Sequence, residues 1–408
     1  MSFKKAYLNI RLKANALYVV LIIGVLVAIL LSSFLLLVHH HRLFQLKSFN
    51  TSKNISALHQ AFFAYPELKN SLKMTSGYWG AFRKVQIEDE DHKLVKAALL
   101  CGKKDSVYPS LYLEDHHSPL VLAGKSSLEG RLELPDGYWK PGAVNGRYFT
   151  GTTTIKRINP SAEMPPINLE WRRYVEGLLL GNNLESKELN LAKNHFKNSF
   201  LNPVNLLQSH GGNFLQAELI GNIIVRDDVG ITVSANSKLQ DILLVAPYIT
   251  IENGFKGTIH CIANHIEIEN NVVLNYPSSI VAIEDEENPA VSDGTYTDIR
   301  IGENVLLNGF VIFLNNNSNL YDNRNVDISL GTNSKLVGDV YSQGYLELKG
   351  EVIGSIYTSY FMYASDRGGK YINYLYDSRI SLNELKTHYT GSLPLQRTTD
   401  YIVASWLY

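Results

Sequence analysis

Cysteine is scarce in this sequence: Cys101 and Cys261 are the only two among 408 residues. Two cysteines are too few for the disulfide framework that stabilises many small secreted domains. We interpret them as two buried thiols, and a disulfide between them in an oxidising compartment stays open as the alternative. The fold is therefore not expected to depend on disulfides.

An excess of charge of one sign is also missing, because 38 Lys and Arg residues stand against 39 Asp and Glu residues. Nucleic-acid binding needs a concentrated positive field, so nucleic acid is excluded as a main partner. The sequence also contains no phosphate-binding loop, no Ser/His/Asp nucleophile elbow and no CxxC motif. The enzyme classes that depend on these motifs are not indicated.

Long uncharged runs are absent except for one, ALYVVLIIGVLVAILLSSFLLLV at residues 16–38. This run exceeds the roughly 20 residues that a helix needs to cross a bilayer. A cleaved signal peptide is the alternative, but its apolar region is shorter and is followed by small residues. Here three histidines and Arg42 follow, so we predict a retained transmembrane helix. A single span is not expected in a channel or transporter.

Basic residues flank the predicted transmembrane helix on both sides. Four precede it without an acidic residue among them, and three follow it: Lys4, Lys5, Arg11, Lys13, then Arg42, Lys47, Lys53. The N-terminal excess predicts a cytoplasmic segment 1–15 and an extracytoplasmic body, in the periplasm or at the cell surface. His39, His40 and His41 are interpreted as a lipid-interface cluster, because adjacent residues imply no fixed metal-ligand geometry.

Local patterns divide the body into five segments. Loosely helical apolar spacing predicts a helical stalk over 39–75, and short strands with turn residues predict a β-rich region over 76–158. A proline-containing break followed by helical spacing predicts a helical insertion over 159–213. Residues 214–363 alternate short apolar runs with Asn, Gly, Ser and Asp, which indicates an all-β domain. The segment 364–408 is expected to cap it.

An internal repeat identifies the kind of β-structure. APYITIENGF from Ala246 matches ANHIEIENNV from Ala263, about 17 residues later, and DIRIGENVLL fits the same pattern. Such a period predicts a parallel β-solenoid, in which both apolar residues of each I-x-I pair point inward. We therefore expect Ile251, Ile268 and Ile301 to stack in the core. An antiparallel sandwich is the alternative.

Further copies of the repeat extend it in both directions. ITVSANSKL from Ile231 matches ISLGTNSKL from Ile328, and LVLAGKSSLEGRL from Leu120 aligns with the latter as an early coil. Asn and Gly at the corners are expected in the left-handed backbone conformation that a sharp bend needs. The segments 284–294 and 315–325 exceed the repeat, so they are expected to loop out.

Two resemblances to known families follow from these segments. SLGTNSKLVGDVYSQGYLELKGEVIGSIYTS, residues 329–359, resembles bactofilins, which implies a β-helical fold and a polymer-forming structural role. The chain departs from that family in its anchor, stalk and insertions. The layout of apolar helix, β-helical body and YLYDSRI…YIVASW ending is similar to pilin-like pilus-assembly proteins. A prepilin peptidase site requires a Gly before the helix and a Glu early within it, and NIRLKANALYVV has neither.

Solenoid enzymes form an alternative of a different class. IGENVLLNG from Ile301 resembles the repeat of hexapeptide acyltransferases, which implies a catalytic histidine. His260 and His265 flank one unit, but we interpret them as surface or stacking residues. Carbohydrate-active solenoids use polar groups on an exposed sheet face. The outward positions carry polar residues that solvent exposure also explains: Glu252, Glu267, Glu269, Asp298 and Arg300.

Three acidic stretches could bind cations. EDED at 88–91 and EDEE at 284–287 are interpreted as solvated loops, with calcium binding as the alternative. EDHH at 114–117 offers metal ligands but is interpreted as a turn beside Pro119.

The sequence thus predicts a mainly β protein: a parallel β-solenoid with an N-terminal transmembrane helix, a helical stalk and a helical insertion. A non-enzymatic structural or scaffold role is expected, with no catalytic, cofactor-binding or metal-binding residues. The expected partners are the lipid bilayer and either other envelope proteins or further copies of the chain. A pilin-like component of a pilus or secretion apparatus and a carbohydrate-active solenoid enzyme are the alternatives.

Overall fold

The computed structural model describes most of the chain, and every structural statement below concerns these residues. The described ranges are 3–65, 72–89, 93–102, 108–181, 187–188, 195–284, 297–316, 325–365, 367–382 and 401–408. The chain forms two compact units, Met1–Ala61 and Phe62–Tyr408. The fold is mainly β, with two α-helices and many short strands among the described residues.

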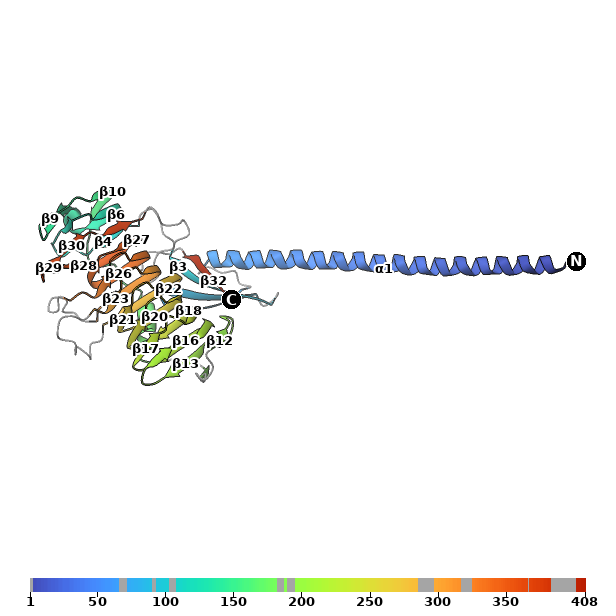
Figure 1. The fold of residues 1–408 in the computed structure, drawn as a ribbon. Helices are drawn as coiled ribbons and strands as arrows, with labels where there is room; N and C mark the ends of the chain where they lie inside the picture. The colour runs from blue at the N-terminus through green and yellow to red at the C-terminus, as the bar shows by residue number, and fades with distance from the viewer. Residues whose placement is uncertain are drawn as a thin grey trace. The chain divides into compact units, whose positions relative to one another are not determined.

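The first unit is helical. Helix α1 (Phe3–Phe63) is one continuous helix of 61 residues (Figure 1). From Ala16 onward it is long and apolar enough to cross a membrane. The stalk predicted over 39–75 is helical as far as Phe63, and the prediction was wrong for 73–75, which begin β1. The helix ends early because Tyr65 precedes a proline, which disfavours the helical conformation in the residue before it.

The second unit begins with an antiparallel sheet that the C-terminus completes. Its strand order is β1 (Lys73–Trp79), β2 (Phe82–Asp89), β3 (Leu94–Gly102) and β32 (Tyr401–Leu407). Strand β32 pairs with β3, so the first and last strands of the unit share one sheet. The predicted cap over 364–408 is therefore wrong for β32, which pairs within this sheet instead of closing an end of the repeat.

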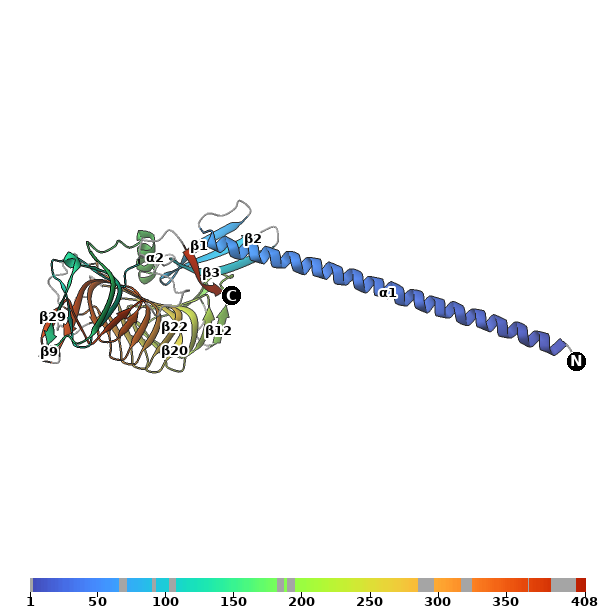
Figure 2. The same cartoon turned by 90° about the horizontal axis from the view of Figure 1, so that it is seen from above.

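Most remaining strands pair in parallel and form three rows, which we call rows A, B and C (Figure 2). Row A contains β14 (Asn213–Leu215), β17 (Gly230–Val233), β19 (Tyr248–Ile251), β21 (His265–Ile268), β23 (Ile299–Ile301), β25 (Ile328–Leu330) and the end of β26 (Lys335–Leu348). It continues as β30 (Tyr374–Tyr376), β5 (Leu120–Ala123) and β7 (Trp139–Pro141).

Rows B and C share several long strands: β18 (Lys238–Val245), β20 (Lys256–Ala263), β22 (Val273–Ile283), β24 (Leu306–Leu314), β26, β6 (Ser127–Leu134) and β10 (Thr152–Pro160). Row B also contains β12 (His195–Asn198), β15 (Glu218–Gly221), β27 (Glu351–Ile353) and β31 (Arg379–Ser381). Row C also contains β11 (Lys187–Glu188), β13 (Asn205–Ser209), β16 (Ile223–Asp227), β28 (Ile356–Ala364) and β4 (Leu111–Leu113).

The I-x-I pairs of the repeat lie where the sequence predicts them. Ile251 pairs with Ile268, Ile268 with Ile301, and Ile301 with Leu330, and all four side chains are buried. The corners after these strands also follow the prediction. Each has one residue in the left-handed conformation, at Gly254, Asn271, Asn304 and Asn333.

The N-terminal strands join the C-terminal side of the rows. In row B, Leu128 of β6 pairs with Ile380 of β31, and Ile380 pairs with Val352 of β27. In row C, β4 lies between β28 and β6. The early repeat around Leu120 therefore does not lie beside the first strands of the main repeat. Its neighbouring strands β4 and β6 pair instead with β28 and β31, which come late in the sequence.

Six of these strands form a closed ring of parallel pairings: β4, β6, β31, β27, β26 and β28. The ring closes because β6 and β26 each pair with different strands at different points along their length. Strand β31 thus has partners on both sides, so this part of the predicted C-terminal cap lies inside the stack.

The helical insertion predicted over 159–213 is only partly helical. Helix α2 (Leu169–Leu179) begins after Asn168, whose side chain accepts hydrogen bonds from two backbone N–H groups of the first turn. The prediction was wrong for 195–209, which form β12 and β13. Parallel pairing with β15 and β16 outweighs the weak helical spacing of the apolar residues there.

Two large hydrophobic cores and one small cluster result among the described residues. One large core lies inside the three rows, and the other covers the outer side of row C with α2 and the four-stranded sheet. Trp171 Nε1 donates to the Gly80 carbonyl and Trp79 Nε1 donates to the Asp241 carbonyl, both at 2.9 Å. These bonds satisfy the indole N–H groups that burial removes from water. Row C is therefore covered along this side, as Figure 2 shows for α2 and β1–β3.

Candidate functional site

The strongest candidate site is a pair of aspartates at the start of two neighbouring strands of row A. Asp298 precedes β23 and Asp327 precedes β25, and the Ile299 N–H donates to the Asp327 carbonyl at 2.8 Å. The Tyr345 N–H donates to Asp327 Oδ2 at 2.5 Å. One carboxyl group therefore lies directly after the other along the row.

Burial favours the protonated form of these two groups. It raises the pKa of Asp298 to about 7, and the neighbouring Glu284 carboxylate adds to the shift. Burial, followed by the proximity of Asp298, raises the pKa of Asp327 well above its ordinary value. Neighbouring carboxyl groups with raised pKa values are common in active sites, which makes the pair a candidate site.

The sequence analysis named Asp298 but missed Asp327. Both follow the same pattern, an Asp directly before the strand in TDIRI and VDISL, so a comparison of the repeats could have found the second. Asp298 is also less exposed to solvent than predicted, because its side chain is only partly accessible.

We expect the proton on Asp298 to make the protein more stable in acid. A carboxyl whose folded pKa exceeds its unfolded value of about 4 binds its proton more tightly when folded, so stability falls as pH rises from about 4 to about 7. At roughly 1.4 kcal/mol per pKa unit, the loss is at most about 4 kcal/mol. Urea unfolding at pH 4.5 and 7.5 measures it, as the difference between the wild type and Asp298→Asn.

The matched control is Asp136→Asn, at an exposed carboxylate. This variant should keep the wild-type pH dependence, whereas Asp298→Asn should flatten it. An Asp298→Asn variant with the full wild-type dependence would show that Asp298 ionises normally in the folded protein.

The other outward candidates have structural partners. Glu267 and Arg300 lie side by side in row A, with Arg300 Nη1 3.2 Å from Glu267 Oε1. The side chains are 37% and 66% exposed, so the pair contributes at most about 1 kcal/mol. Glu252 accepts a hydrogen bond from the Ala235 N–H, and Glu269 accepts one from the Asn253 N–H. These two hydrogen bonds connect turns that follow neighbouring strands of row A.

His260 lies under the four-stranded sheet and is fully buried, so the prediction of a surface position was wrong. Its Nδ1 is 2.8 Å from Ser279 Oγ, and its ring contacts Phe82 edge to face. Burial lowers the pKa of His260 to about 3. Ser279 Oγ also accepts from the Ala81 N–H, so this Ser–His pair joins the sheet to row C. A substrate has no access to it.

His265, the other candidate histidine, is half-buried in row A, with its ring 5.9 Å from the Tyr248 ring. Burial lowers its pKa. The interpretation as a stacking residue agrees with this position.

A second group of potential ligands comes from two turns. Ligand atoms of Asp115, His117 and Asp136 all lie within 4.8 Å of one another, the one such group of three among the described residues. Two of its members lie in EDHH, which the sequence analysis interpreted as a turn, and Asp136 is contributed by η1 (Pro135–Gly137). His117 is 90% exposed. The group has the chemistry to bind a divalent cation but lies open to solvent.

The remaining acidic stretches are described only in part. Glu88 and Asp89 end strand β2, so the first half of EDED is not a loop. Glu284 directly follows β22, and the rest of the EDEE segment lies outside the described residues, as do most of the segments expected to loop out. Cys101 and Cys261 are both buried and do not form a disulfide, and burial raises the pKa of the Cys261 thiol.

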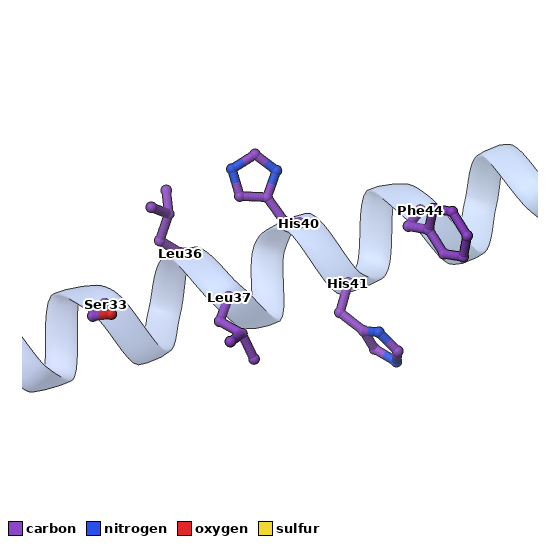
Figure 3. A pocket seen from close by; sticks show the side chains of 6 residues that line it. All are labelled: Ser33, Leu36, Leu37, His40, His41 and Phe44. Carbon is purple, nitrogen blue, oxygen red and sulfur yellow. The ribbon is translucent and has the colours of Figure 1, made fainter.

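The three histidines of α1 do not converge. A shallow indentation on the helix is lined by Ser33, Leu36, Leu37, His40, His41 and Phe44 (Figure 3). Figure 3 shows His40 and His41 pointing to opposite sides of the helix, and the His41 Nε2 is 2.9 Å from Gln45 Nε2. Adjacent positions on a helix face different directions, so these rings do not form a common metal site.

No family model matches the chain, and neither the curated proteins nor the solved structures contain a match to it.

Proposed function

We propose that the chain is a membrane-anchored structural protein whose body is a parallel β-solenoid outside the cytoplasm. Each coil of this solenoid visits rows B, C and A in turn. Strand β20 supplies rows B and C, for example, and β21 supplies row A of the same coil. A coil has no stable partner for its backbone except its neighbours, so the stack acts as one unit.

The closed ring of six strands fits this interpretation. Strand β26 is 14 residues long and pairs in all three rows, with β27, β28 and β25. A strand that bends around two corners of one coil pairs in this way. The ring then follows from continuous coils and does not require a separate barrel.

Anchorage is supported by α1, which is apolar enough to cross a membrane from Ala16 onward. The excess of basic residues before the apolar run supports a cytoplasmic N-terminus. The observation that carries the structural role is the stack itself, because its interior is filled by interlocking apolar side chains in every row.

One open end of the stack has features that prevent edge-to-edge pairing. Among the described strands, β10 pairs with β6 alone, so its other edge is free. Lys156 and Arg157 are exposed on it, and the register shifts between Ile155 and Arg157. Charged residues and bulges are common protections of free edges. We therefore propose partners along the sides of the solenoid, with other envelope proteins favoured over end-to-end polymers.

The second candidate, a carbohydrate-active solenoid enzyme, is favoured by one observation. Asp298 and Asp327 are neighbouring carboxyls with raised pKa values, an arrangement that is common in active sites.

The location can be tested with Thr154→Cys, which places a thiol on exposed β10 while Cys101 and Cys261 stay buried. A membrane-impermeant maleimide should label this variant in intact spheroplasts. Ala6→Cys should be labelled only after lysis. Deletion of 16–38 should move the protein from the membrane fraction to the soluble fraction. Labelling of Ala6→Cys alone in intact spheroplasts would reverse the proposed orientation.

The same cells distinguish a structural from a catalytic role. A strain that lacks the gene is complemented with Asp298→Asn or Asp327→Asn, and protein levels are matched. The structural role expects both to restore the wild-type phenotype. Loss of function in either variant, with the fold intact by thermal melting, would favour the enzyme.

A further inference from the structure

Four tyrosines form a cluster on the outer side of row A. Tyr363 and Tyr371 lie opposite each other on β28 and β29 (Lys370–Ile372), and Tyr374 and Tyr376 follow on β30. The ring centroids of Tyr363 and Tyr376 are 4.8 Å apart, and those of Tyr371 and Tyr374 are 5.2 Å apart. Each of the four side chains is half-buried, so part of the cluster faces solvent. We call this group the tyrosine platform.

The outward face of the platform continues onto strands from the N-terminal part of the second unit. Tyr374 is in register with Val121 of β5, and Val121 is in register with Lys140 of β7. Lys140 is exposed, and its Nζ lies 5.5 Å from the ring centre of Tyr138, which is 39% exposed. Aromatic and basic side chains therefore lie next to each other across three neighbouring strands.

Basic side chains also border the platform on other strands. Arg147 is exposed on β9 (Arg147–Tyr148), and its Nη1 donates to the Tyr376 hydroxyl at 3.2 Å. Lys370 is exposed on β29, and Figures 1 and 2 show β9 and β29 at the same end of the second unit. Lys125 is exposed in the turn after β5. We call these four exposed cations the basic border: Lys125, Lys140, Arg147 and Lys370.

Fewer acidic groups lie beside the platform in the described part of the chain. Asp377 is exposed, and its Oδ1 accepts a hydrogen bond from the Lys125 N–H at 2.7 Å. Glu347 is buried and pairs with Lys349 at 3.0 Å, so these two charges offset each other beside the Tyr363 ring. One exposed carboxylate thus stands against the basic border, and the surface carries an excess of positive charge.

We propose that the tyrosine platform and the basic border bind an acidic glycan, a polysaccharide chain that carries carboxylate groups. The positive charge of the surface is complementary to these carboxylates. The planar guanidinium of Arg147 suits a carboxylate, and its bond to the Tyr376 hydroxyl positions it while a guanidinium has further N–H groups to donate. Tyrosine rings offer flat faces to the C–H groups of sugar rings, and tyrosine hydroxyls can bond to sugar hydroxyls.

The spacing of the strands favours a glycan over an acidic peptide. Neighbouring strands are roughly 4.8 Å apart, about the length of one sugar ring, whereas an extended peptide turns a side chain to one face only every ~6.8 Å. Tyr374, Val121 and Lys140 lie on neighbouring strands, so a polysaccharide that crosses them can place one sugar over each.

The choice of a glycan over nucleic acid rests on the proposed function, which places the body outside the cytoplasm. It agrees with the balanced charge of the whole chain, since nucleic acid requires a more extensive positive field.

Biolayer interferometry tests the proposal with the full-length chain in a detergent that has neither a charge nor a sugar headgroup. The sensors carry polygalacturonate, alginate or the neutral polysaccharide dextran. At least one of the two acidic polysaccharides should bind the protein, and dextran should not. Raising the salt concentration from about 0.1 M to about 1 M should weaken this binding at least tenfold, because salt screens exposed charges.

Two double variants separate the charges from the rings. Lys140→Gln/Arg147→Gln should weaken binding at least tenfold, and Tyr363→Ala/Tyr376→Ala should weaken it several-fold. The matched control is Lys238→Gln/Lys256→Gln, which removes two exposed positive charges from row B and should bind as the wild type does. All four substituted basic side chains are exposed, so these variants stay informative if the tyrosine variant fails to fold.

Polyglutamate and an oligothymidylate represent the competing occupants. Stronger binding to either of them than to the acidic polysaccharides would overturn the proposal. Binding to neither acidic polysaccharide, or equal binding by the basic-border variant and the row B control, would overturn it as well. Binding to a purified polysaccharide does not depend on where the body lies in the cell, whereas maleimide labelling of Thr154→Cys does. A failure of the glycan proposal is therefore distinguishable from a failure of the proposed location.

Discussion

Ile268→Asp is expected to lower the free energy of unfolding by more than about 4 kcal/mol, because it places an unpaired carboxylate inside the row A core. Ile268 is fully buried and pairs with Ile251 on one side and Ile301 on the other. Neither neighbour has a polar group that could compensate the charge. Urea unfolding of the detergent-solubilised chain, followed by circular dichroism, measures the loss.

The control for this variant is one residue away. Glu267→Ala changes an outward side chain whose contact with Arg300 is a partly exposed ion pair. It should change stability by less than about 1 kcal/mol. Equal melting of Ile268→Asp and the wild type would mean that the register of row A differs from the one described.

Ile380→Asp is expected to separate two parts of the chain that lie far apart in sequence. Ile380 is fully buried, between Val352 of β27 and Leu128 of β6. A charge there should disrupt both pairings, because it removes the shared core contact and is itself left unpaired. Hydrogen exchange should then show lost protection in β6 and in β27 together.

Arg379→Ala is the matched control for that experiment. Its side chain is 41% exposed and forms ion pairs with Glu351 and Glu129 on the outer side of the same strands. Protection in β6 and β27 should stay near the wild-type level. If Ile380→Asp exposed β27 but left β6 fully protected, the pairing of β31 with β6 would be wrong.

The repeat in row A could be predicted from sequence because its cause is local. Alternation decides which residues of an I-x-I pair point inward, and corners need Gly or Asn wherever the backbone turns left-handed. Ile251, Ile268 and Ile301 are therefore buried and stacked as predicted, and Asn271 and Asn304 occupy the corners.

The order of the strands within each row could not be predicted, since it depends on which strand edges are still unpaired when the remaining strands join. The alignment of Leu120 with Ile328 indicates similar coils but says nothing of their neighbours. The buried position of His260 was missed for a related reason: the sheet that covers it comes from β1–β3, and no pattern links these strands to row C.

The candidate site was predictable only in part. Asp298 was found as a polar residue beside an I-x-I pair, but its raised pKa depends on burial and on Glu284. Asp136 joins Asp115 and His117 through a turn made by a different segment. Such tertiary proximity leaves no spacing signal in the chain.

The closed ring that contains both β4 and β31 limits how such a protein can be made and how it can evolve. During synthesis, residues 111–160 emerge first. The start of β6, Ser127 and Leu128, nevertheless has no partner on one edge until β31 has been made, because β4 pairs only with Leu132 and Glu133. Almost the whole chain must therefore be synthesised before the pairing of these strands can be completed. For the same reason, adding a repeat at either terminus would not lengthen the stack. New strands can lengthen the rows as insertions within the chain, for example after β10, whose other edge has no partner among the described strands.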